Sequence, residues 1–183
     1  EELGIAAGLQ DRVIQIYGGV VSMDFSKDRM RSLKGMSCGV YERLDPALLP
    51  PLYLAYSTAV GEPTEVVHNN LRHRFREGEP AVVEAMQRFA ELTDHARDAI
   101  LAGDSARLGQ LIDANFDLRR SICQIASGQM EMVERARNAG ATAKFAGSGG
   151  AIIGTCPDEV TFQRLVADLE PIRCAVIRPV IGE

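Results

Sequence analysis

The 183-residue chain contains no tryptophan, and only 5% of its residues are aromatic. No apolar run approaches the roughly 20 residues that span a bilayer. The chain does not open on a basic segment followed by an apolar one, so no secretory signal is predicted. We therefore expect a cytoplasmic protein without a membrane partner. The formal net charge of −5 disfavours a general nucleic-acid binder, but a local basic site for one anion is compatible with it.

Signatures of metal sites and of common phosphate loops are also missing. The four cysteines, Cys38, Cys123, Cys156 and Cys174, are scattered and contain no Cys-x-x-Cys pair. They could form two disulfides, but buried free thiols in a reducing compartment are the favoured interpretation for a chain of this size without a signal. The three histidines lack His-Glu-x-x-His spacing, so no zinc site is predicted. A Gly-x-x-x-x-Gly-Lys-Ser/Thr loop is absent as well.

The most informative stretch that is present covers residues 8–19. Leu9, Val13 and Ile16 have the spacing of one apolar helix face, and two glycines follow the stretch as a stop. Asp11 lies off this face in the expected first turn, where unpaired backbone N–H groups favour a carboxylate. The pattern alone leaves two interpretations open, a surface aspartate that complements the helix dipole or a catalytic carboxylate.

The order of the expected elements predicts an α+β fold. Beyond the first helix, strands at 20–25 and 37–44 are expected to complete a remnant of an N-terminal unit, residues 1–48. Residues 49–183 then follow the order strand, helices, strand, strand, helix, strand, which is a ferredoxin-like plan with inserted helices in the first crossover. The expected elements are strands at 52–57, 141–146, 151–156 and 173–178, and helices at 65–77, 80–102, after Asp104, at 129–139 and after Asp158.

Two polar residues lie on the flank of the apolar face of the helix that follows Asp104. Asn115 and Arg119 are four residues apart, so they share one side of that helix. A buried polar group without a partner costs about 1–3 kcal/mol. The pair is therefore either ordinary polarity at a helix boundary or part of a polar ligand site. The basic helix at 65–77 is interpreted as a solvated face.

A glycine-rich loop between two expected strands is the second candidate site. Its successive backbone N–H groups could form a nest that binds an anion. The same residues also suit a tight hairpin turn that needs no ligand. The residues concerned are Lys144, Gly147, Ser148, Gly149 and Gly150.

Three segments resemble segments of the GHMP small-molecule kinases and occur in the same order as in that family. Their sequences are most similar to those of the glucuronokinases. The first (6–25) is a Gly-x-x-Asp helix start followed by a Tyr-Gly-Gly turn and a strand. The second (115–120) reads Asn-Phe-Asp-Leu-Arg-Arg. The third (144–151) reads Lys-Phe-Ala-Gly-Ser-Gly-Gly-Ala. Other sugar 1-kinases, such as those for heptose phosphates, share the general plan.

The resemblance implies a role for each candidate residue. Asp11 corresponds to the catalytic carboxylate, and the likeness of residues 115–120 favours Asn115 and Arg119 as substrate-binding residues. Arg12 is a further substrate-binding candidate, because it is next to Asp11. An arginine fork suits a carboxylate, so we expect Arg12 or Arg119 to contact the acid group of the acceptor. The loop from Lys144 corresponds to the third conserved motif of the family, which lies against the phosphate loop of the nucleotide site. The implied cofactors are ATP and Mg²⁺, with no metal ligand in this chain.

The implied reaction is phosphorylation of the anomeric hydroxyl of D-glucuronate to the 1-phosphate. Alternatives are another GHMP kinase, of heptose-phosphate or galactose type, and a non-catalytic ferredoxin-like binding module. The family's Pro-x-x-x-Gly-Leu-Gly-Ser-Ser segment is not in this sequence. We therefore expect the N-terminal half of the kinase, in cis or as a separate chain, to supply most of the ATP site, and this stretch alone to be inactive. The same half is expected to cover the apolar faces of the first helix and hairpin.

Overall fold

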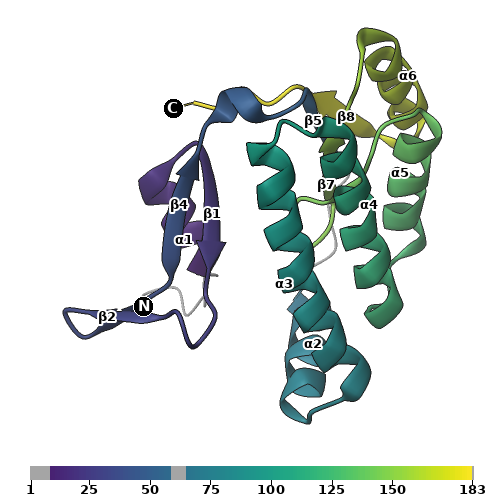
Figure 1. Ribbon diagram of the computed structural model, residues 1–183. Coiled ribbons are helices and arrows are strands. Elements are labelled where there is room, and N and C mark those ends of the chain that lie inside the picture. The colour runs from purple at the N-terminus through teal and green to yellow at the C-terminus, as the bar shows by residue number, and fades with distance from the viewer. Residues whose placement is uncertain (1–8, 59–64, 183) are drawn as a thin grey trace. The chain divides into compact units, whose positions relative to one another are not determined.

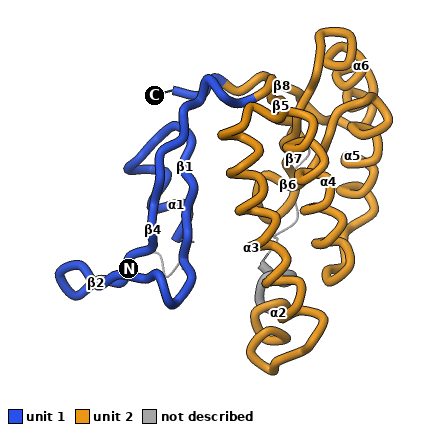
Figure 2. The backbone as a smooth tube through the Cα atoms, viewed as in Figure 1, with its two compact units in different colours: residues 1–49, 180–183 blue, residues 50–179 orange. Residues whose placement is uncertain are grey.

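The computed structural model describes residues 9–58 and 65–182, which fall into two compact units. Unit 1 comprises residues 1–49 and 180–183, and unit 2 comprises residues 50–179 (Figure 2). Most of the expected loop at 58–64, and the start of the first segment before Leu9, lie outside the described residues. No helix in the described ranges is long and apolar enough to cross a bilayer.

Unit 1 is built from a short helix and short antiparallel strand pairs. Of the apolar face expected on α1, only Val13 is buried, while the side chains of Leu9 and Ile16 are 49% and 81% exposed. Strands β1 and β4 pair in register from Val20 opposite Leu44. The elements are α1 (Leu9–Tyr17), β1 (Val20–Asp24), β2 (Arg31–Leu33), β3 (Met36–Cys38), β4 (Val40–Leu44) and the 3₁₀ turn η1 (Pro46–Leu48).

The prediction of a single strand at 37–44 is wrong, because the strand is broken at Gly39. The backbone of Gly39 packs against the carbonyl of Asp24 and the ring of Phe25, so a side chain has no room there. Residues before the break form β3, which pairs with β2 in a separate hairpin. The two turn residues of that hairpin, Lys34 and Gly35, have φ values of 50° and 79°, as a type I′ turn requires.

Unit 2 combines five helices with a four-stranded sheet among its described residues (Figure 1). The strand order is β6-β7-β5-β8, and every neighbouring pair is antiparallel. Helix α4 packs on β6 and β7, and α6 packs on β8. The elements are β5 (Leu52–Ser57), α2 (Glu65–Arg76), α3 (Pro80–Leu101), α4 (Ser105–Ile122), α5 (Ser127–Asn138), β6 (Lys144–Phe145), β7 (Ala151–Thr155), α6 (Glu159–Leu169), η2 (Glu170–Ile172) and β8 (Cys174–Ile177).

The expected helix boundaries of unit 2 are confirmed where a capping residue defines them. Pro80 occupies the first turn of α3, and Gly103 follows that helix with a φ of 65°. The carboxylates of Asp104 and Asp158 accept hydrogen bonds from backbone N–H groups in the first turns of α4 and α6. The strand expected at 141–146 is shorter in the structure, although the N–H of Thr142 still bonds to β7.

The core of unit 2 lies between the sheet and α4, α5 and α6. Tyr53 is fully buried on β5, and its hydroxyl donates to the carbonyl oxygen of Thr142 at 2.8 Å. This burial raises the pKa of Tyr53 far above its ordinary value. The rings of Phe116 and Phe145 meet edge to face at 5.2 Å, which joins α4 to β6. All four cysteines are free thiols, and two of them are buried.

Replacing Gly154 tests this packing. A Cβ on Gly154 would coincide with the carbonyl of Thr142 and lie 2.9 Å from the ring of Tyr53. Gly154→Ala should lower the free energy of unfolding by about 2–3 kcal/mol, as overpacking does. The matched control is Gly128→Ala in α5, where a Cβ meets nothing within 4 Å, and it should raise that free energy by about 0.5–1 kcal/mol. Equal stability of both variants in chemical denaturation would contradict the packing.

Candidate functional site

The glycine-rich loop joins β6 to β7 as a hairpin. The N–H of Ala146 donates to the carbonyl of Ala151 at 3.0 Å and closes a loop of four residues, 147–150. Gly149 and Gly150 have φ values of 151° and 74°, which L side chains rarely adopt. The loop therefore requires glycine at these two positions for backbone reasons alone.

Arg119, in the last turn of α4, binds this loop. Its Nη1 donates to the carbonyl of Gly147 at 2.8 Å, and its Nη2 donates to the carbonyl of Ser148 at 2.9 Å. The guanidinium also lies over the ring of Phe145, 4.9 Å from the centroid. The structure thus places Arg119 and the loop together, and the fork of the arginine is engaged by two consecutive backbone carbonyls.

These two hydrogen bonds also fix the direction of backbone donors. No peptide bond in the described residues is cis. In a trans peptide the N–H points opposite to the C=O of the same plane. The N–H groups of Ser148 and Gly149 share planes with the two bound carbonyls, so both point away from Arg119. Successive N–H groups on one side of a loop form the kind of concavity that binds anions.

Lys144 lies at the start of β6 and is half-buried. Its Nζ donates to the carbonyl of Phe145 at 3.2 Å. Burial lowers the pKa of Lys144, and the positive charge of Arg119 lowers it further. Burial likewise lowers the pKa of Arg119. Neither cation forms an ion pair with a carboxylate of the described residues, so an anion beside the loop would be stabilised by both.

Of two further residues, the sequence predicted Asn115 as a site residue and did not predict Gln129. Asn115 lies one turn before Arg119 on α4 and is half-buried, and its side chain forms no hydrogen bond with the described residues. Gln129, in the first turn of α5, was not expected at the site. Its side-chain amide lies directly on Gly149, where a Cβ would be 2.6 Å from Nε2 of Gln129. No feature of the sequence marks this contact, because the two residues belong to different elements.

An arginine network holds the base of the same hairpin. Arg137 on α5 lies 3.0 Å from Oδ1 of Asp113 and 2.8 Å from Oδ1 of Asp117, both on α4. Oδ1 of Asp113 also accepts the N–H of Ala143, just before β6, at 2.8 Å. Burial is the largest influence on Asp113 and raises the pKa of its carboxyl group, although the N–H bond and Arg137 oppose this. These contacts give Asp117 a structural partner.

Asp11 and Arg12 belong to unit 1 and are neighbours on α1, whose first turn contains Asp11. Both side chains are exposed. The structure therefore presents the predicted site residues as two groups, one on α1 and one around the glycine loop of unit 2. In the described ranges, no cluster of three or more His, Cys, Asp or Glu residues is placed to hold a metal ion.

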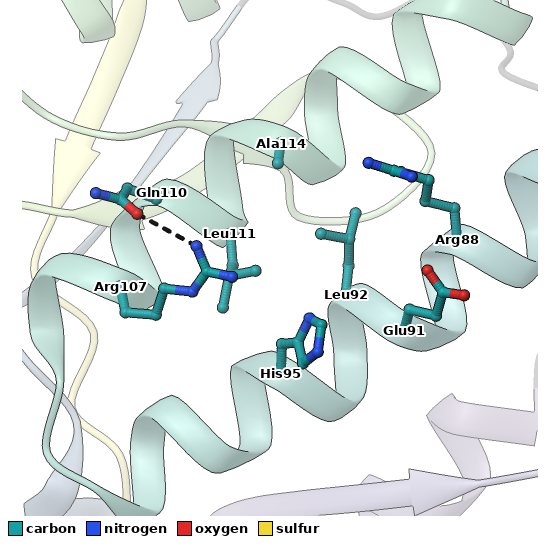
Figure 3. Close-up of a pocket in the computed structure, with 8 residues that line it drawn as sticks. All are labelled: Arg88, Glu91, Leu92, His95, Arg107, Gln110, Leu111 and Ala114. Atoms are coloured by element: carbon teal, nitrogen blue, oxygen red, sulfur yellow. Dashed lines mark hydrogen bonds between the residues drawn. The ribbon is translucent and has the colours of Figure 1, made fainter.

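A cavity of unit 2 is lined by none of the predicted site residues. It is a groove of about 430 Å³ between α3 and α4, with Leu92, Leu111 and Ala114 among its apolar lining residues (Figure 3). Its polar lining mixes three basic side chains with one carboxylate: Arg88, His95, Arg107 and Glu91, together with Gln110. The groove therefore does not alter the assignment of the candidate site to α1 and the glycine loop.

Two curated relatives are similar to most of the chain. The chain is 39% identical over 187 residues to Glucuronokinase 1 of Arabidopsis thaliana, and the aligned region covers 96% of the chain and 50% of that protein. It is 44% identical over 163 residues to Probable glucuronokinase 2 of the same plant, covering 86% and 43%. The chain thus spans about half the length of the curated relatives it matches. No family model matches the chain.

Solved structures agree on the fold. Galactokinase of Lactococcus lactis, complexed with galactose, superposes with a TM-score of 0.70 over 98% of this chain and 56% of that chain. The sequence identity is 17%, so this likeness concerns the fold alone.

The buried charge of Lys144 predicts a stability effect. Because the pKa of Lys144 is lowered in the folded state, the unfolded chain binds more protons between that pKa and the ordinary value. The contribution of Lys144 to stability therefore rises with pH through this window. Lys144→Met should unfold at a higher temperature than the parent at pH 7, and the difference should shrink above pH 10. Parallel melting curves from pH 7 to 11 would contradict a desolvated charge.

Proposed function

Because the chain belongs to the GHMP kinase superfamily, we propose that the whole protein transfers the γ-phosphoryl group of ATP to the anomeric hydroxyl of D-glucuronate. One observation carries this proposal: the chain is 39% and 44% identical to two glucuronokinases. The geometry of the glycine loop is consistent with it, since two cations without carboxylate partners in the described residues lie beside backbone donors.

We further propose that unit 2 is a ferredoxin-like domain with inserted helices. Strand β7 separates β5 from β6, and β5 separates β7 from β8, so the two crossovers interleave as in split β-α-β units. The inserted helices lie in the first crossover, between β5 and β6. Residues 1–48 would then belong to the N-terminal catalytic domain and residues 49–183 to the C-terminal domain.

The phosphoryl donor would be ATP with Mg²⁺. Phosphoryl transfer depends mainly on positioning and on neutralising the charge of the phosphates. Lys144 and the N–H of Gly149 fit phosphate oxygens, because the lysine has no carboxylate partner among the described residues and the N–H points away from Arg119. The described residues offer no carboxylate cluster for a metal, so the contribution of this chain would be to the phosphates.

Asp11 would serve the acceptor. A general base must reach the proton that it removes, and the carboxylate of Asp11, which is exposed on α1, would accept the proton of the sugar hydroxyl. Arg12 beside it would bind the acid group of the sugar. Arg119 is less suited to that role than expected, because both of its Nη groups are engaged by loop carbonyls. Asn115 is left to bind a hydroxyl of the substrate.

The exposed apolar side chains of unit 1 support a partner segment. Leu9, Ile14 and Ile16 on α1 are 49%, 37% and 81% exposed. Large exposed apolar patches are uncommon on soluble monomers. We propose that the N-terminal half of the kinase, in cis or as a separate chain, covers them and supplies most of the ATP site.

The experiment that tests the proposed function is Asp11→Asn in the full-length protein. The change removes the proton acceptor and keeps the size of the side chain, so kcat for glucuronate should fall roughly 10²–10⁴-fold. KM for ATP should change little. The controls are Asp24→Asn and Asp117→Asn, whose carboxylates already accept from Ser26 and Arg137. If Asp11→Asn retains parental turnover while a control is inactive, the catalytic carboxylate is another residue.

Arg12→Lys tests the recognition of the acid group. A lysine keeps the charge and loses the bidentate fork, so KM for glucuronate should rise roughly tenfold, which corresponds to one charge-assisted hydrogen bond. KM for a neutral sugar of the same size should stay within about twofold, since it lacks the carboxylate. Equal increases for both acceptors in steady-state assays would show that Arg12 does not bind the carboxylate.

A further inference from the structure

We propose that Arg119 and Gln129 act together as a clamp on the loop at 147–150, and that this clamp sets the direction of its backbone donors. Both would be positioning residues. The inference rests on the proposed function in one respect, that the loop faces the phosphates of the nucleotide. Its structural part, the clamp itself, is independent of the ligand.

The first half of the clamp is the end of α4. The two Nη groups of Arg119 hold the carbonyls of Gly147 and Ser148 at 2.8 and 2.9 Å. Hydrogen bonds from a charged donor are roughly twice as strong as neutral ones, and a rigid fork holds two acceptors at a fixed spacing. The Phe145 ring lies against the guanidinium and restricts its position.

The second half is the start of α5. The amide of Gln129 covers the Cα of Gly149 so closely that a Cβ would lie 2.6 Å from Nε2 and 3.1 Å from Oε1. Gly149 has a φ of 151°, a conformation that other residues rarely adopt. Glycine is also the residue whose backbone changes conformation most readily. A side chain packed on it is therefore needed to keep one conformation populated.

The two ends of the hairpin are held by the sheet. The N–H of Ser57 donates to the carbonyl of Gly150 at 2.9 Å, and that of Ala146 donates to Ala151 at 3.0 Å. Each residue of the loop thus has a contact from α4, α5 or β5. The centre of the loop is held by Arg119 and Gln129, which belong to the two helices.

The clamp matters because a peptide plane in a glycine loop can rotate. Rotation of the plane between Ser148 and Gly149 by about 180° exchanges the positions of its C=O and N–H. A carbonyl would then face the ligand side, where it repels phosphate oxygens. Arg119 opposes this rotation by binding the carbonyl, and Gln129 opposes it by filling the space beside the Cα of Gly149.

Backbone NMR relaxation on the full-length protein tests the clamp. In Arg119→Lys, the amide order parameters of residues 147–150 should fall from about 0.85, the value of rigid backbone, to about 0.6 or below, because the fork that fixes two carbonyls is lost. Gln129→Ala should also lower the order parameters of this segment, because the contact with Gly149 is lost. The matched controls are Arg120→Lys and Gln87→Ala, whose parent side chains are exposed on helices, and both should leave the loop unchanged.

A double variant tests the contact with Gln129 in particular. Gly149→Ala should loosen the loop strongly, since its Cβ meets the glutamine amide. Adding Gln129→Ala removes that clash, so the double variant should have higher order parameters in the loop than Gly149→Ala alone. Additive losses of order would contradict the assigned contact.

The kinetic readout separates the clamp from the function of the loop. Lower loop order parameters together with a KM for ATP raised about tenfold, at an unchanged melting temperature, support both. Lower loop order parameters with unchanged KM and kcat support the clamp and contradict the role of the loop in phosphate binding. Unchanged loop order parameters in Arg119→Lys and Gln129→Ala overturn the clamp.

Discussion

The pair of hydrogen bonds from Arg119 to two consecutive carbonyls is the interaction on which the candidate phosphate site depends. It uses the full fork of the guanidinium, and it turns two backbone donors to the opposite side of the loop. The bonds require α4 to end beside the β6–β7 hairpin. The edge-to-face contact of Phe116 with Phe145 and the bond from Ala143 to Asp113 maintain that position. Helix α4 therefore contributes both to the packing of the core and to the candidate site.

The positive charges around the loop are electrostatically unfavourable in the protein without a bound anion. Lys144 and Arg119 are like charges that are both withdrawn from water, which is why the pKa of each is lowered. Elsewhere in unit 2 buried arginine is compensated, as Arg137 is by two carboxylates. A cationic pair without carboxylate partners among the described residues is the arrangement expected where the compensating anion is a ligand.

The helix ends could be predicted from the sequence, because they depend on residues at the ends themselves. Pro80, Gly103, Asp104 and Asp158 define helix ends through their own backbone or side chain, and the structure confirms those ends. The break at Gly39 and the packing of Gln129 on Gly149 could not be predicted, because both depend on atoms of other elements. Arg119 was predicted to bind the substrate, whereas its partners in the structure are two backbone carbonyls, which carry no sequence signal.

The central claim is that the full-length protein is a kinase of a sugar acid. The most direct measurement compares D-glucuronate, D-galactose and mevalonate as acceptors with ATP and Mg²⁺, by kcat/KM and by identification of the product. The account predicts glucuronate 1-phosphate, with a kcat/KM at least about 100-fold above D-galactose, because a site built to bind a carboxylate rejects analogues that lack it. Mevalonate, which has a carboxylate but no anomeric hydroxyl, should be an equally poor acceptor. A preference for galactose or mevalonate, or no phosphorylated product from any acceptor, would contradict it.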